Sequence, residues 1–142
     1  MNAIESRPAL AAAKTLLEAA QLPTVDLTQA HCEHFFYQGP PAAPTGLVGL
    51  ELFGDVALLR SLVVSPAVRA SGAGSALLGH AEDYARSTGV ETMYLLTTTA
   101  EDFFARRGYV RTARDSAPPA IRSTREFAGI CPASSAFMSK QL

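Results

Sequence analysis

The residues whose types and spacing could do chemistry begin with a glycine turn between an aliphatic run and an amphipathic run. The stretch VVSPAVRASGAGSALLGHAEDYA (63–85) places Arg69, Gly72 and Gly74 in the pattern R-A-S-G-A-G. Glycines let a backbone turn sharply and bring its N–H groups close to a ligand, and the start of the following helix adds a partial positive charge. The turn is therefore suited to a diphosphate, and a tight connection that binds nothing is the alternative.

A second candidate is Glu51, a carboxylate inside otherwise aliphatic sequence. The runs GLVGLELF and VALLRSLVV are separated by the dipeptide GD, which predicts a β-hairpin. With a two-residue turn, Glu51 faces Leu58 and lies diagonal to Arg60; with a loop one residue longer, it shares its face with Ser61. Glu51 could then accept a proton from an amine, while Arg60 orients it or holds an anionic substrate. A structural Glu51–Arg60 ion pair, or a Glu51 at a solvated edge, is the alternative.

Three further groups of polar residues could contact a substrate or a metal. Thr97 ends a strand-like run, and its hydroxyl could donate to a substrate or cap the next helix. Arg122 and Arg125 could hold a carboxylate, or they could lie on a solvated helix face. The sequence HCEH (31–34) has metal-ligand residue types, but no second ligand pair accompanies it, so we predict no metal site.

The composition limits the classes of partner. The chain has 142 residues, 48% of them hydrophobic and 18% charged, with a formal net charge of −1 and no long run of one sign. A nucleic-acid or membrane-surface role therefore has no electrostatic support. No apolar run approaches the ~18 residues that a membrane span needs. Two cysteines cannot form a disulfide framework, which favours a cytoplasmic location.

The order of predicted elements indicates how these residues are positioned. Ser6 and Pro8 can open a helix through ALAAAKTLLEAA, followed by a helical turn and a strand at 35–37. After the hairpin come a helix at 74–87, the strand ETMYLLT, a helix in AEDFFARRGY and the strand YVRTA. Short helices in PPAIRSTREFAGICP and a terminal strand in SAFMSK complete the chain. We predict a single α/β domain over 1–142, with a mixed, mostly antiparallel sheet, flanking helices and one parallel strand–helix–strand crossover.

The sequence from Leu58 to Arg111 resembles the GNAT N-acetyltransferase superfamily. In that family the turn is written Gln/Arg-x-x-Gly-x-Gly/Ala and binds the pyrophosphate of acetyl-CoA, and a later helix carries an aromatic pair before Gly-Phe or Gly-Tyr. Here the corresponding segments are RASGAG and FFARRGY. The phrases LLRSLVV, YLLTTTAEDFFARRGY, IRSTREFAGICP and MSK also resemble the acetyltransferases encoded with arsenic-resistance genes.

The resemblance implies a cofactor site around the glycine turn. The strand at Leu62, Val63 and Val64 would pair with the pantetheine arm of acetyl-CoA. The helix that contains Phe104 would lie beside the thiol end. The pyrophosphate would be held by Arg69, Ala70, Ser71, Gly72, Ala73, Gly74 and Ser75.

One family feature is missing from the aromatic pair. In much of the superfamily a tyrosine of this pair protonates the departing thiolate, whereas this chain has Phe103 and Phe104. A thiol with a pKa near ~8.5 can leave unaided, and water could protonate it. We therefore predict an acetyl-CoA-dependent N-acetyltransferase acting on a small amine, such as an amino-acid-like toxic compound with an anionic tail. A non-catalytic acyl-CoA-binding module is the alternative, and a homodimer is expected because many relatives are dimers and a sheet edge needs cover.

Overall fold

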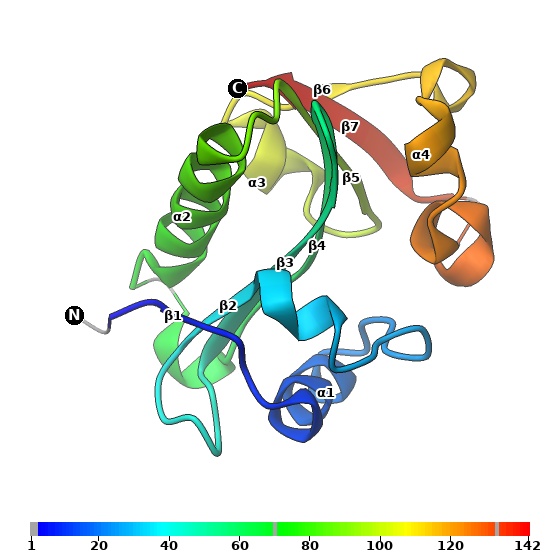
Figure 1. Cartoon of the computed structure of the whole chain (residues 1–142). Helices are drawn as coiled ribbons and strands as arrows, with labels where there is room; N and C mark the ends of the chain where they lie inside the picture. The colour runs from blue at the N-terminus through cyan, green and yellow to red at the C-terminus, as the bar shows by residue number, and fades with distance from the viewer. Residues whose placement is uncertain (1–2, 70, 133) are drawn as a thin grey trace. The chain divides into compact units, whose positions relative to one another are not determined.

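Seven strands form one mixed sheet in the computed structural model, which describes residues 3–69, 71–132 and 134–142 (Figure 1). The strands are β1 (Glu5–Ser6), β2 (Phe35–Gln38), β3 (Gly46–Phe53), β4 (Val56–Val64), β5 (Thr92–Thr97), β6 (Val110–Arg111) and β7 (Ala136–Gln141). They are hydrogen-bonded in the order β1-β2-β3-β4-β5-β7-β6, with one parallel pair. The predicted α/β class with a mixed sheet and flanking helices is confirmed.

The predicted helical segments are present in the predicted order, together with two short ones, at 66–68 and 114–116, that the sequence does not predict. They are α1 (Leu10–Ala19), η1 (His31–His34), η2 (Pro66–Val68), α2 (Ala73–Ser87), α3 (Glu101–Ala105), η3 (Arg114–Ser116), α4 (Pro119–Arg122) and η4 (Glu126–Ile130). None of the helices in the described ranges is both long and apolar enough to cross a membrane. The chain divides into two compact units, the first formed by residues up to 51 with 59–84, and the second by 52–58 with 85–142. The single-domain assignment stays a prediction.

In the first unit, strand β2 has a helix on each face. Side chains alternate between the faces of a strand, so neighbouring aromatic residues of β2 pack on different partners. Phe35 and Tyr37 belong to the core cluster to which α1 contributes. Phe36 points the other way and contacts the rings of His80 and Tyr84 on α2, with centroids 4.7 and 5.0 Å away. Strand β2, which pairs with β3, is thus held between α1 and α2 (Figure 1).

In the second unit, β5 and β6 pair antiparallel with β7. Phe137 of β7 stacks on Tyr94 of β5 with ring centroids 5.4 Å apart. Phe137 also belongs to a buried cluster with Leu58, Ala117 and Ile121. The polypeptide after β6, predicted as a loop with short helices, therefore supplies core residues to this unit.

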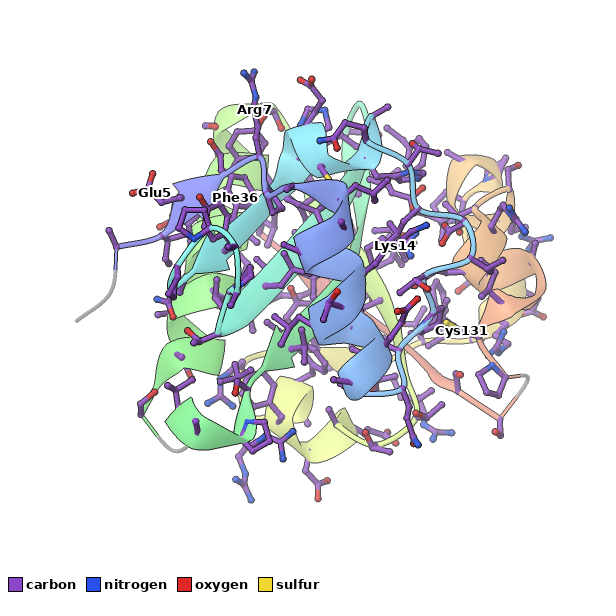
Figure 2. All side chains as sticks on the ribbon, turned by 90° about the horizontal axis from the view of Figure 1, so that it is seen from below. Glu5, Arg7, Lys14, Phe36 and Cys131 are labelled. Atoms are coloured by element: carbon purple, nitrogen blue, oxygen red, sulfur yellow. The ribbon has the colours of Figure 1, made fainter. Side chains whose placement is uncertain are left out.

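The N-terminal segment differs from the prediction. The first helix begins at Leu10, because the preceding residues pair with β2: β1 lies antiparallel to it, and the Arg7 backbone N–H donates to the Phe35 carbonyl at 3.0 Å. Two residues are too few to give a strand pattern in the sequence. Glu5 and Arg7 project outward (Figure 2), and Arg7 forms an exposed ion pair with Glu33 at 3.6 Å.

Candidate active site

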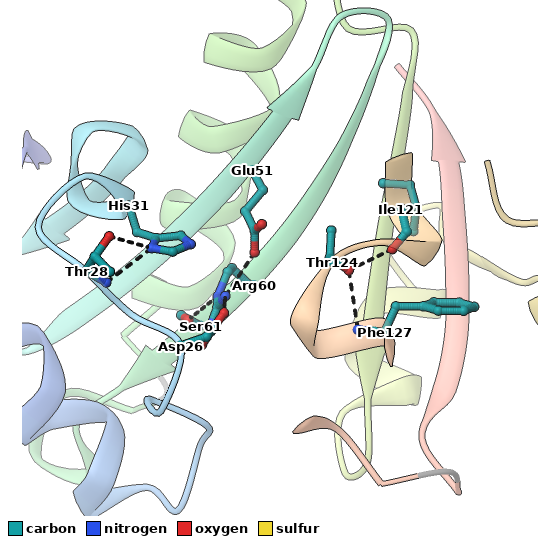
Figure 3. Close-up of polar contacts among 9 residues, drawn as sticks. All are labelled: Asp26, Thr28, His31, Glu51, Arg60, Ser61, Ile121, Thr124 and Phe127. Carbon is teal, nitrogen blue, oxygen red and sulfur yellow. Dashed lines mark hydrogen bonds and ion pairs between the residues drawn. The ribbon is translucent and has the colours of Figure 1, made fainter. Parts of the chain in front are cut away.

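Arg60 is the centre of a buried polar network in the first unit (Figure 3). Its guanidinium side chain is 0% exposed. Nη1 donates to Asp26 Oδ2 at 2.5 Å and to Glu51 Oε2 at 2.9 Å, and Nη2 donates to Asp26 Oδ1 at 2.9 Å. Nε donates to the Ser61 hydroxyl at 3.2 Å. All three guanidinium nitrogens are therefore bonded to protein groups, which favours an orienting role for Arg60 over the capture of a substrate anion.

The hairpin explains why Glu51 and Arg60 meet. Strand β3 ends at Phe53 and β4 begins at Val56, so the turn has two residues, which is the first of the two predicted alternatives. Glu51 on β3 reaches Arg60 on β4 in this arrangement. The predicted ion pair is present. A catalytic role for Glu51 stays a prediction.

Ser61 has a left-handed backbone inside β4. Its φ is 60°, which is unusual for a residue other than glycine. Such a conformation costs on the order of 1–3 kcal/mol and occurs mainly where surrounding contacts enforce it, often at functional sites. Here the neighbouring residue is Arg60, whose Nε holds the Ser61 hydroxyl. The strained residue therefore lies next to the buried ion network.

The network has more negative than positive groups. Burial alone would raise the pKa of Asp26, but the hydrogen bonds and charge of Arg60 outweigh it and lower that pKa below its ordinary value. Asp26 is thus ionised at neutral pH. Two carboxylates share one guanidinium, so a negative charge remains uncompensated by Arg60 when Glu51 is ionised as well. The less buried of the two carboxylates is Glu51, whose side chain is 16% exposed against 3% for Asp26.

His31 lies beside this network. One side-chain atom from each of Asp26, His31 and Glu51 lies within 4.8 Å of the other two. The Thr28 backbone N–H donates to His31 Nδ1 at 3.1 Å, so the neutral ring carries its proton on Nε2. Three such residues could in principle ligate a metal, but the Arg60 guanidinium already bridges both carboxylates. We therefore assign no metal to this cluster.

The glycine turn connects β4 to the N-terminus of α2. Gly72 has a φ of 85°, and a Cβ built there would meet no atom within 4 Å. Its carbonyl accepts the first helical hydrogen bond, from the Ala76 N–H at 3.0 Å. Arg69 and Ser71 are exposed, and Arg69 Nε donates to the Val64 carbonyl at 3.2 Å. This turn is open on the side of Gly72 and places the exposed side chains of Arg69 and Ser71 before a 15-residue helix, with the Ser71 hydroxyl donating to the Val68 carbonyl.

The individual cofactor residues of the prediction differ in their surroundings. Val63 is buried in the core cluster that includes α1, while its neighbours on β4 are half-buried. The Ser71 amide already donates to the Val68 carbonyl at 3.3 Å. Helical N–H groups in a first turn lack intrahelical acceptors, so the main-chain donors that could reach a phosphate belong to the first turn of α2, which begins at Ala73. Ala70 was also predicted to bind the cofactor, and it lies outside the described residues.

The remaining predicted residues belong to the second unit. The Thr97 hydroxyl accepts a hydrogen bond from the Ala100 N–H at 3.0 Å, before α3. Phe104 is buried, edge-on to Phe103 and to Tyr109 with centroids 5.2 and 5.6 Å away. The Thr97 hydroxyl thus holds the backbone before α3, and Phe104 packs in an aromatic cluster. Binding roles for Thr97 and Phe104 stay predictions.

The cationic segment of the second unit is held by its own backbone. The Arg122 guanidinium donates to the carbonyls of Asp115 and Ala117. Thr124 is buried, donates to the Ile121 carbonyl at 2.7 Å and accepts from the Phe127 N–H (Figure 3). Arg125 is exposed. Arg122 thus stabilises the fold of this segment, and a substrate-binding role for either arginine stays a prediction.

Asp26 is the residue that sequence reasoning missed. It is 34 positions from Arg60 and stands in a loop, PTVDLTQ, with no periodic pattern. The signal in the sequence is indirect: a buried arginine needs a carboxylate partner, and Glu51 on the facing strand already supplies one. His31 has the residue type of a metal ligand in the sequence, whereas its position on η1 brings it to the same two carboxylates.

Comparison with protein families gives a match over most of the chain. Residues 11–111 match the acetyltransferase (GNAT) family. An amino-acid acetyltransferase of Ralstonia nicotianae is 37% identical over 60 residues, which are 42% of this chain and 13% of the relative. One from Pseudomonas syringae pv. tomato is 36% identical over 69 residues, or 49% and 16%. The matched regions thus span about one sixth or less of these curated relatives.

Solved structures share the fold. N-acetylglutamate synthase from Neisseria gonorrhoeae, complexed with coenzyme A and N-acetyl-glutamate, has a TM-score of 0.83 at 24% identity; the match covers 100% of this chain and 35% of that one. Rv2747 from Mycobacterium tuberculosis, in complex with CoA and NLQ, has a TM-score of 0.79 at 18% identity and covers 99% of both chains.

Proposed function

Since the chain belongs to the acetyltransferase (GNAT) family, we propose that it transfers an acetyl group from acetyl-CoA to the amine of a small, amino-acid-like molecule. The transfer requires an amine that has lost its proton, a polarised thioester carbonyl and a thiolate that departs. The amine nitrogen forms a bond to the acetyl carbon, the carbon–sulfur bond breaks, and the amine proton passes to a base or to water. The products are an amide and free coenzyme A.

The observation that carries this proposal is the open glycine turn after β4. Gly72 leaves space for a ligand to approach the backbone, and the first turn of α2 contains no acidic residue that would repel an anion. Arg69 and Ser71 add exposed polar groups on the same turn. A diphosphate bound there would be held by main-chain donors and by the positive end of the helix dipole.

Glu51 is the proposed base. It is half-buried, with a guanidinium on Oε2, and no described residue donates a hydrogen bond to Oε1. That oxygen is therefore available to an ammonium group or to a water that carries its proton. Ser61 is the neighbouring polar residue on β4 and keeps Arg60 in place through its hydroxyl. In this proposal Arg60 and Ser61 orient Glu51.

The acceptor class rests on the named relatives. The relatives named above from Ralstonia nicotianae and Pseudomonas syringae are amino-acid acetyltransferases, and the structural neighbour from Neisseria gonorrhoeae is complexed with N-acetyl-glutamate. An α-amino acid supplies both an amine and an anionic tail, which agrees with the acceptor expected from the sequence. The narrower likeness to acetyltransferases of arsenic-resistance genes stays a prediction about which amino-acid-like compound is used.

Release of the coenzyme A thiol across a panel of amino acids and simple amines tests the proposal. We expect amine-dependent release with at least one amino acid and little release with water alone. The second candidate, a non-catalytic acyl-CoA-binding module, is favoured by Phe104, which is packed in an aromatic cluster where a tyrosine often supplies a proton. Tight acetyl-CoA binding without thiol release for any amine would support that candidate.

A further inference from the structure

We propose that Asp26 is a positioning residue, which keeps Glu51 available to the substrate amine by holding the Arg60 guanidinium. The inference rests on the proposed function, in which Glu51 takes the proton of the amine. Asp26 is too deeply buried to contact the amine in this role and acts through Arg60.

The geometry divides Arg60 unequally between the two carboxylates. Asp26 is bound through both of its oxygens, by Nη1 at 2.5 Å and by Nη2 at 2.9 Å. Glu51 is bound through one oxygen, by the Nη1 that Asp26 already shares. Bidentate pairs are the stronger and more directional arrangement, so Asp26 is the main counter-ion of Arg60. Glu51 is left with a weaker, shared contact.

The charges make this division important for the chemistry. A guanidinium that paired with Glu51 alone would stabilise the ionised carboxylate and make it a poorer proton acceptor. The ionised Asp26 counteracts this in two ways: it occupies Arg60, and its own negative charge favours proton uptake by the nearby Glu51. Both effects have the same sign, so loss of the Asp26 charge should shift proton uptake by Glu51 to lower pH.

The groups that face Glu51 come from three elements of the first unit. Arg60 lies on β4, Asp26 lies in the loop before η1, and His31 lies on η1. His31 accepts the Thr28 N–H at Nδ1, and protonation there would break this bond. Asp26 is thus the group whose charge can be removed from the network while His31 and Arg60 remain.

Four variants of the full chain test the role of Asp26. Asp26→Asn removes the charge with little change of shape, and Glu51→Gln removes the proposed base. The double variant measures whether the two residues act together, and Asp26→Glu restores the charge. Glu33→Gln, which breaks the exposed Arg7–Glu33 pair, is the control for loss of an ion pair elsewhere in the same unit.

The first measurement is kcat from thiol release with the best amine of the panel. We expect Asp26→Asn to lower kcat near neutral pH by ~10-fold, and the double variant to be no slower than Glu51→Gln. Asp26→Glu should recover part of the loss, and Glu33→Gln should behave as wild type. If the losses of Asp26→Asn and Glu51→Gln multiply in the double variant, the two residues act independently and the proposal is wrong.

The second measurement does not depend on activity. Carbon NMR of a ¹³C-labelled Glu51 carboxyl follows its proton uptake in wild type and in Asp26→Asn, and we expect the midpoint of the variant at lower pH. An unchanged midpoint in a folded variant would leave Asp26 with a purely structural role. If Asp26→Asn does not fold, the smaller neutral variant Asp26→Ser takes its place. If wild type acetylates no amine, the proposed function fails while the NMR result still decides whether Asp26 controls Glu51.

Discussion

Replacing Gly72 with valine tests two roles of the glycine turn, its effect on the stability of the fold and its effect on the affinity for acetyl-CoA. Gly72 has a φ of 85°, and a side chain there meets no protein atom within 4 Å. The substitution therefore adds no clash within the protein and destabilises the fold through the left-handed backbone, by about 1–2 kcal/mol. The same Cβ would stand where backbone and diphosphate must approach each other. We expect acetyl-CoA affinity to fall by ~10-fold or more, which is at least about 1.4 kcal/mol of binding free energy.

Isothermal titration with acetyl-CoA measures the affinity, and urea denaturation measures the free energy of unfolding. Gly89 is the matched control, because it follows the other end of α2 with a φ of 98° and also has no atom within 4 Å of a built Cβ. Gly89→Val should lose a similar amount of stability and bind acetyl-CoA as wild type does. A folded Gly72→Val protein with unchanged affinity would refute the placement of the diphosphate at this turn.

Three further predictions concern the ion network and assembly. Glu51→Gln should lower kcat by ~10²-fold near neutral pH with little change in acetyl-CoA affinity, and the defect should shrink as pH rises and free amine becomes available; normal turnover at neutral pH would mean that the base lies elsewhere. The pKa of Asp26 is lower in the fold than its ordinary value of 3.8, so its ion pair stabilises the protein above that value and is lost as pH falls through the folded pKa. In urea denaturation, wild type should therefore be more stable than Asp26→Asn at neutral pH, and this difference should shrink in acid. We also expect a homodimer, because β1 and β6 are the edge strands of the sheet and such edges need cover. Light scattering that finds a monomer at high concentration would contradict this.

The elements around the glycine turn could be predicted because local sequence determines them. The dipeptide GD between two aliphatic runs gave the hairpin, and the first of its two possible registers brings Glu51 to Arg60. Helix α2 begins at Ala73, one residue before the predicted start. In each case the hydrophobic period and the turn residues agree with the tertiary structure.

The polar network could be predicted only in part, because its members come from distant segments. Asp26 reaches Arg60 from a loop without periodicity, between α1 and η1. The left-handed φ of Ser61 has no signal in the sequence, since serine in a strand-like run predicts an ordinary extended residue. Tertiary contacts, not local preference, determine both features.

Mass spectrometry of the reaction products tests the central claim most directly. Wild-type protein incubated with acetyl-CoA and the amino-acid panel should yield an N-acetylated amino acid and an equal amount of free coenzyme A, and Glu51→Gln should yield far less of both. Acetyl-CoA that binds wild-type protein tightly but remains intact, with no acetylated amine among the products, would contradict the account and identify the chain as a cofactor-binding module.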